Sequence, residues 1–148
     1  MITLSVTHDS ITPVLQKLAS QSGVVREAVL RAMVTTLKSI TEGNFSAAGS
    51  AFRVAPWANK YDGSAATLRK SGTLWKSFHV AATAQEATLS NPTIYAAIHQ
   101  QGGWRSAKEV TMPARPFVPV DANGQLSPSA AALLRRAGER ALAGLFKG

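Results

Sequence analysis

The chain has 148 residues, enough for one domain with a buried core, and no cysteine, which excludes disulfides and thiolate metal sites. Hydrophobic residues make up 45% of the sequence and charged residues only 16%, a balance that excludes disorder of the whole chain. The formal net charge is +8, but the cations are scattered, which favours a basic solvated surface or acidic partner subunits over a nucleic-acid footprint.

The N-terminus lacks the charged start and long apolar run of a signal peptide, and no segment reaches the ~20 apolar residues that cross a bilayer. We therefore expect a soluble protein that is made inside the cell and has no membrane partner. Residues 1–148 are expected to form a single domain.

The N-terminal part predicts one strand followed by two helices. Residues 2–7 alternate apolar and polar side chains, as a half-buried strand does. Asp9 or Ser10 caps a short helix that ends near Leu18, and a longer helix runs from about Val24 to Asn44. The apolar stripe expected on the longer helix consists of Val25, Val29, Met33, Leu37 and Ile40.

Residues 47–67 carry Gly49, Pro56 and Gly63 without a clear period. Irregular segments of this length in a compact domain are usually functional or disordered. We expect this loop to be mobile in the isolated subunit and to become ordered on assembly.

A hairpin is expected next. Residues 73–82 have strand composition, with Leu74, Phe78 and Val80 on one face. Residues 86–90 form a second short strand with Ala87 and Leu89 pointing inward, and the turn lies at Ala84-Gln85.

Asn91-Pro92 then predicts the start of a helix, which Gly102-Gly103 ends. The spacing of Ile94, Ala97 and Ile98 predicts that this side of the helix packs on the sheet.

A basic segment leads from this helix to an extended strand over residues 115–120. Ser127-Pro128 caps a final helix, whose expected buried stripe is Ala130, Leu133, Leu134, Ala137, Ala141 and Leu145. The order of elements is strand, helix, helix, hairpin, helix, strand, helix, which favours an α+β fold.

One stretch of the chain resembles the core signature of the phage virion-morphogenesis, or tail-completion, proteins. The residues that carry the resemblance are Tyr95-Ala96, Ile98-His99-Gln100, Gly102-Gly103 and Pro113-Ala114-Arg115-Pro116-Phe117. The resemblance implies a small, mainly antiparallel sheet of about four strands packed by helices, as in tail-terminator proteins.

The resemblance also implies a function. The protein would be a non-enzymatic assembly protein of a tailed bacteriophage or prophage that completes the tail end or joins tail to head. Its partners would be the tail tube and the neck or head connector. It would act as a homo-oligomer, with a ring of six subunits implied by relatives, first in the host cytoplasm and then in the virion tail or neck.

Catalytic chemistry has no candidate in the sequence. None of His8, His79 and His99 has metal-ligand spacing, so no metal or cofactor is expected. There is no Gly-x-Ser-x-Gly elbow and no phosphate-binding glycine loop. His99 shares a helix face with Tyr95, which suits a structural histidine; a hydrolase that uses His99 remains as a third hypothesis.

Aromatic residues and arginine are enriched at protein interfaces, and the polar loop after Gly103 presents a tryptophan and two cations, which makes five residues candidates for the assembly interface. These are Trp104, Arg105, Lys108, Arg115 and Trp57. The alternative for Trp104 is that it folds back onto its own domain. Arg115, held between prolines, either crosses a subunit boundary or closes a salt bridge within its own chain.

The main rival function is a basic DNA-binding accessory protein. It is motivated by the net charge of +8 and by a helix-turn-helix reading of residues 10–44. That reading lacks a convincing turn, so specific nucleic-acid binding is not expected.

Overall fold

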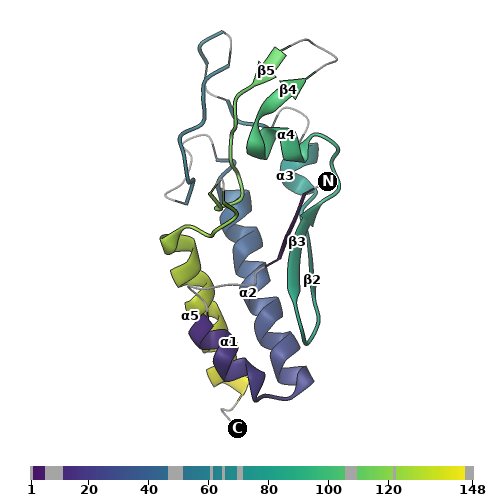
Figure 1. Cartoon of the computed structure of the whole chain (residues 1–148), viewed down its shortest axis with the longest axis vertical. Coiled ribbons are helices and arrows are strands. Elements are labelled where there is room, and N and C mark those ends of the chain that lie inside the picture. The colour runs from purple at the N-terminus through teal and green to yellow at the C-terminus, as the bar shows by residue number, and fades with distance from the viewer. Residues whose placement is uncertain are drawn as a thin grey trace. The chain divides into compact units, whose positions relative to one another are not determined.

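Figure 1 shows a computed structural model of the chain. The structure describes residues 2–5, 12–46, 52–60, 62–64, 66–69, 72–105, 110–121 and 123–145. The chain divides into two compact units. The first unit comprises Met1–Ile2, Ile40–Phe78 and Asn91–Ser127, and the second comprises Thr3–Ser39, His79–Ser90 and Pro128–Gly148. The expectation of a single domain stays a prediction.

Three helices contribute to the second unit: α1 (Thr12–Ala19), α2 (Gly23–Gly43), whose last turn from Ile40 belongs to the first unit, and α5 (Pro128–Leu145). The predicted long helix is therefore confirmed. The Ser22 hydroxyl accepts a bond from the Val25 N–H and so caps the start of α2.

The buried face of α2 agrees with the predicted stripe, except that Val25 is only half-buried. Its fully buried members are Val29, Met33 and Leu37. On α5 the stripe was partly wrong: Leu145 is 48% exposed, and Ala131 and Gly138 are buried. Small side chains line this face of α5, and α1 lies beside it (Figure 1). The buried face of α5 thus includes small residues that the leucine spacing did not indicate.

The sheet of the second unit has the strand order β1-β3-β2. The strands are β1 (Ile2–Ser5), β2 (His79–Ala82) and β3 (Ala87–Asn91). β2 and β3 form an antiparallel hairpin in which Ala82 is opposite Ala87. The predicted hairpin is confirmed, and Ala87 and Leu89 are buried as expected.

In the first unit, the prediction of one strand over residues 73–82 was wrong in its first half. Thr73–Lys76 forms a short helix, α3, after Gly72, whose φ of 76° turns the chain. Leu74 and Phe78 are both buried. Residues four apart share a face in a strand and also in a helix, so this spacing did not distinguish the two.

The helix expected from Asn91 begins later, as α4 (Ala96–Gln101). The Asn91 side chain accepts a bond from the Thr93 N–H and donates one to the Leu74 carbonyl, so it caps a local turn and not a helix. The predicted apolar face was wrong, because Ile94 is 90% exposed and the buried positions of α4 are Ala96 and Gln100.

A second antiparallel hairpin, β4 (Gly103–Arg105) with β5 (Val110–Met112), was not predicted. Conversely, residues 115–120 do not form the predicted strand; Val120 makes only an isolated bridge to Leu126. The described chain is α+β, as expected. Its strands are five and lie in a three-stranded and a two-stranded sheet, in place of one sheet of about four.

Aromatic rings form the centre of the first unit. Phe45 contacts three of them at centroid distances of 5.2 Å to Phe117, 5.7 Å to Trp57 and 6.0 Å to Phe78. Edge-on and tilted contacts of this kind stabilise beyond the area they bury. This cluster holds the end of α2, the 52–60 segment and the 115–118 segment around one core.

Candidate assembly interface

Arg115 ties the irregular 52–60 segment to the chain that follows β5. Its guanidinium donates to the carbonyls of Ala58, at 2.9 Å, and Asn59, at 3.1 Å. Its own N–H donates to the His99 carbonyl at 2.7 Å. Arg115 is only 7% exposed, so these bonds compensate much of the cost of burying its charge. The sequence left two alternatives for Arg115, a contact across a subunit boundary or a salt bridge within its own chain. The described contacts of Arg115 are within its own chain, but they are hydrogen bonds to backbone carbonyls.

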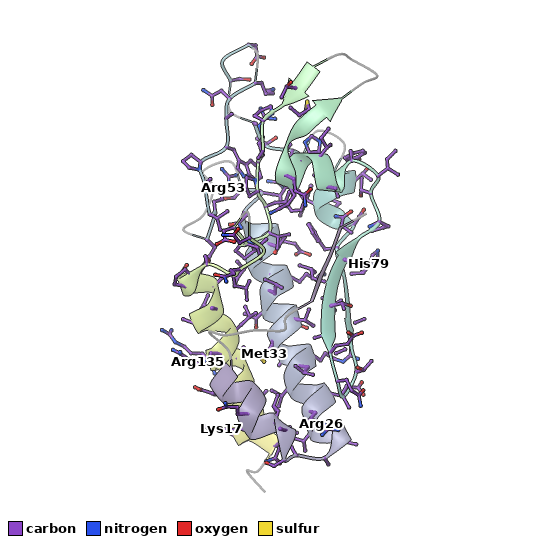
Figure 2. The ribbon with its side chains drawn as sticks, viewed as in Figure 1. Lys17, Arg26, Met33, Arg53, His79 and Arg135 are labelled. Carbon is purple, nitrogen blue, oxygen red and sulfur yellow. The ribbon has the colours of Figure 1, made fainter. Side chains whose placement is uncertain are left out.

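Trp57, which precedes Ala58, connects the same two segments by a bond to Pro116, the residue after Arg115. Its indole N–H donates to the Pro116 carbonyl at 2.8 Å, and the side chain is 8% exposed. The guanidinium of Arg53, labelled in Figure 2, stacks 3.6 Å above the indole centroid. The 52–60 segment is therefore held to residues 115–116 by two bonds from Arg115 and one from Trp57.

Arg53 also closes the beginning of this segment. It donates to the carbonyls of Asn44, at 2.8 Å, and Ser46, at 3.1 Å, just after the end of α2. Partial burial lowers the pKa of Arg53, yet arginine keeps its charge under all ordinary conditions. The segment predicted to be a loop has no helix or strand among its described residues, but Arg53 and residues 57–59 within it are bonded to other parts of the first unit.

Gln100 fixes the 117–118 backbone from α4. Its Oε1 accepts from the N–H groups of Phe117 and Val118, both at 3.0 Å, and its Nε2 donates to the Val118 carbonyl at 3.2 Å. Asn44 adds a bond from its side-chain amide to the Phe117 carbonyl at 2.8 Å. Two side-chain amides thus replace the strand pairing that residues 115–120 lack.

Gly102 sets the root of the β4–β5 hairpin. Its φ is 71°, and a Cβ at this position would lie 2.7 Å from the Ala114 nitrogen and 2.8 Å from the Met112 oxygen. Only glycine permits both the dihedral angle and this approach. The hairpin therefore leaves α4 at a closely packed point.

The predicted interface residues fall into two groups. Trp57 and Arg115 lie together and buried in the first unit. Trp104 and Arg105 belong to β4, opposite Thr111 and Val110, while their side chains are not described. Lys108 lies outside the described residues.

Three residues that join these segments were missed as site residues: Asn44, Arg53 and Gln100. Gln100 and Asn44 are polar residues next to apolar positions in the sequence. This pattern alone does not show that their side-chain amides are buried; that follows only from the backbone groups that they bond. For Arg53 the sequence offers no such signal. His99 meets the Tyr95 ring edge-on at 5.8 Å, as their spacing predicted.

Within the described ranges, no three His, Asp or Glu residues are grouped so that they could hold a metal ion. In the same ranges, no helix combines the length and apolar character needed to span a membrane.

The residues behind the family resemblance have physical roles in this arrangement. Ala96 is fully buried, Gln100 and Arg115 make the bonds described above, Gly102 is sterically required, and Phe117 is in the aromatic core. The search of curated proteins and the search of solved structures found no significant match. A family model described as the phage virion morphogenesis family matches residues 6–128. The chain therefore belongs to the phage virion morphogenesis family, and its role is structural, in the assembly of a phage particle.

Proposed function

We propose that the protein completes the tail end, or joins tail to head, as a ring of identical subunits. Family membership supports a role in virion assembly. The observation that carries the finer proposal is the β4–β5 hairpin, whose two strands pair with each other and with no further strand among the described residues.

A two-stranded hairpin is marginally stable in water without further packing. Here its root is fixed by Gly102 packed against Ala114, and the following residues are held by Arg115. A fixed root lowers the entropy that the hairpin loses on docking. The backbone groups and side chains of the hairpin would then bind a neighbouring subunit or partner protein. Trp104, Arg105 and Lys108 would supply the aromatic and cationic contacts.

Trp57 and Arg115 serve the same surface indirectly in this proposal. Both are buried, and both hold residues 57–59 to the chain that returns from the hairpin. The 52–60 segment and the hairpin would then dock as one preformed surface on the next subunit, the tail tube or the neck. Rings arise from such head-to-tail contacts when the rotation between subunits closes. Six subunits are proposed on the resemblance, with assembly in the host cytoplasm before incorporation into the virion.

The test is a double substitution, Trp104→Ala with Arg105→Ala, in a phage whose own copy of the gene is inactivated. We expect normal folding by circular dichroism and a loss of infectious particles, with separate heads and tails visible by electron microscopy. Arg140→Ala on the exposed side of α5 is the matched control and should complement fully.

Two outcomes would contradict this assignment. If the double variant unfolds, Trp104 belongs to the core of its own subunit. If it folds and complements normally, the contact surface lies elsewhere. The DNA-binding alternative is tested on the wild type: affinity that falls steeply with salt would indicate phosphate contacts and favour that alternative.

A further inference from the structure

β2 forms one edge of the sheet in the second unit, and no described strand pairs on its outer side. The turn of the β2–β3 hairpin shows which residues of β2 direct their N–H and C=O groups toward β3 and which direct them to the outer side. The Thr83 N–H donates to the Glu86 carbonyl at 2.8 Å, which makes this pair a hydrogen-bonded one. Bonded and non-bonded pairs alternate in an antiparallel ladder, so Ala82 and Val80 direct their N–H and C=O groups away from β3.

An independent contact agrees with this assignment. The Ala82 carbonyl accepts a bond from the Arg31 guanidinium at 3.3 Å, as an outward-facing carbonyl can. Both backbone groups of Val80 and the N–H of Ala82 have no partner among the described residues. The outer side of β2 therefore keeps most of a strand's hydrogen-bonding capacity.

β2 also lacks the features that usually protect an edge strand. Its sequence from His79 to Ala82 contains no lysine, carboxylate or proline, and its four pairs with β3 run without a bulge. His79, labelled in Figure 2, and Ala81 are exposed. An unprotected edge of this kind can accept a further strand from another chain.

The opposite edge of the same sheet is β1, which has four residues, as β2 has. We propose that the outer edge of β2 pairs with β1 of a neighbouring copy. The two edges are different strands, so each copy offers one donor edge and one acceptor edge, and the contact repeats head to tail. This inference rests on the proposed ring, because it supplies a further contact between neighbouring subunits, in addition to the β4–β5 hairpin. Pairing of β2 with β2 would instead be isologous and stop at a dimer.

Val80→Pro tests the proposal, because it removes an outward N–H while Val80 makes no bond to β3. Val80→Thr keeps the N–H with a β-branched side chain and is the matched control. Light scattering coupled to size exclusion should show an oligomer for the wild type and for Val80→Thr. Val80→Pro should shift to the mass of one 15.6 kDa subunit, with an unchanged circular dichroism spectrum.

Disulfide trapping keeps the proposal testable if Val80→Pro does not fold. The chain has no cysteine, so Ala81→Cys protein can be mixed with Thr3→Cys or Ser5→Cys protein under oxidation. Paired strands bring Cα atoms within disulfide reach, so a mixed disulfide is expected for one of the two combinations. A wild-type monomer at all concentrations, or a dimer with disulfides between Ala81→Cys chains alone, would overturn the inference.

Failure of this inference can be told apart from failure of the proposed function. If Val80→Pro forms the same oligomer as the wild type, and the cysteine variants form no mixed disulfide, β2 does not make the contact. Complementation of the phage still reports separately on tail completion. If the wild-type gene does not complement tail completion, the proposed function fails whatever the oligomer.

Discussion

Gln100 serves Phe117 as a strand neighbour would: its side-chain oxygen accepts the Phe117 N–H at 3.0 Å. The same oxygen accepts the Val118 N–H at 3.0 Å. Residues 115–118 can therefore be buried without belonging to a sheet. The N–H groups of both Phe117 and Val118 therefore depend on one side-chain amide on α4.

Gln100→Ala should destabilise the protein by about 2–6 kcal/mol, because it leaves two buried N–H groups without an acceptor at about 1–3 kcal/mol each. The neighbouring Gln101 is exposed, so Gln101→Ala is the control and should change stability by no more than about 0.5 kcal/mol. Urea unfolding monitored by tryptophan fluorescence measures both. Equal midpoints for the two variants would show that the Phe117 backbone is satisfied in another way.

The sequence predicted the long elements well and the short ones poorly. α2 has 21 residues and a stripe that repeats over several turns, so its position could be read directly. β4 and β5 have three residues each, too few for a period to appear. Asn91 was misassigned because an asparagine that caps a helix and one that closes a turn both accept a nearby N–H.

For the candidate site, residue type alone singled out Trp57 and Arg115. Nothing in the sequence could show that Trp57 and Arg115 join the same pair of segments, since the residues they bond lie 56–59 positions away along the chain. Gln100 was missed for the same reason. Local spacing reports on a helix or strand, but contacts between distant segments depend on how the core packs.

Arg115→Lys should release residues 57–59. A lysine keeps the charge but cannot place two donors in the fixed fork that reaches the Ala58 and Asn59 carbonyls. Loss of one charge-assisted bond, worth about 1.5–3 kcal/mol, should raise protease cleavage in this segment by about tenfold or more. Arg136→Lys on the exposed face of α5 is the control. Unchanged cleavage in Arg115→Lys would show that Trp57 alone holds the segment.

The Asp62 carboxylate should report on the turn in which Lys60 is bonded to Gly63 and Ser64. Bonds from the Ser64 hydroxyl and the Ser64 N–H lower the pKa of Asp62. A lowered pKa in the folded state means that the turn is stabilised above the ordinary pKa of aspartate and loses this contribution as the pH falls through the folded pKa. Ser64→Ala should therefore raise the pKa of Asp62, measured by an NMR titration of its carboxyl carbon. Ser64→Thr retains the hydroxyl and should leave the pKa low; equal values in both variants would exclude the hydroxyl as the cause.

Gly102→Ala should disturb the hairpin and, with it, assembly. The new Cβ would lie 2.7 Å from the Ala114 nitrogen at a φ of 71°, so the backbone between α4 and β5 must shift. We expect a loss of stability of about 1–3 kcal/mol from the strained dihedral angle and a larger loss of phage complementation. Gly43→Ala is the matched control, because a Cβ there meets nothing within 4 Å and alanine favours the helix end where Gly43 lies. If Gly102→Ala is destabilised and still complements fully, the position of the β4–β5 hairpin does not matter for assembly, and the docking surface lies on other residues of the chain.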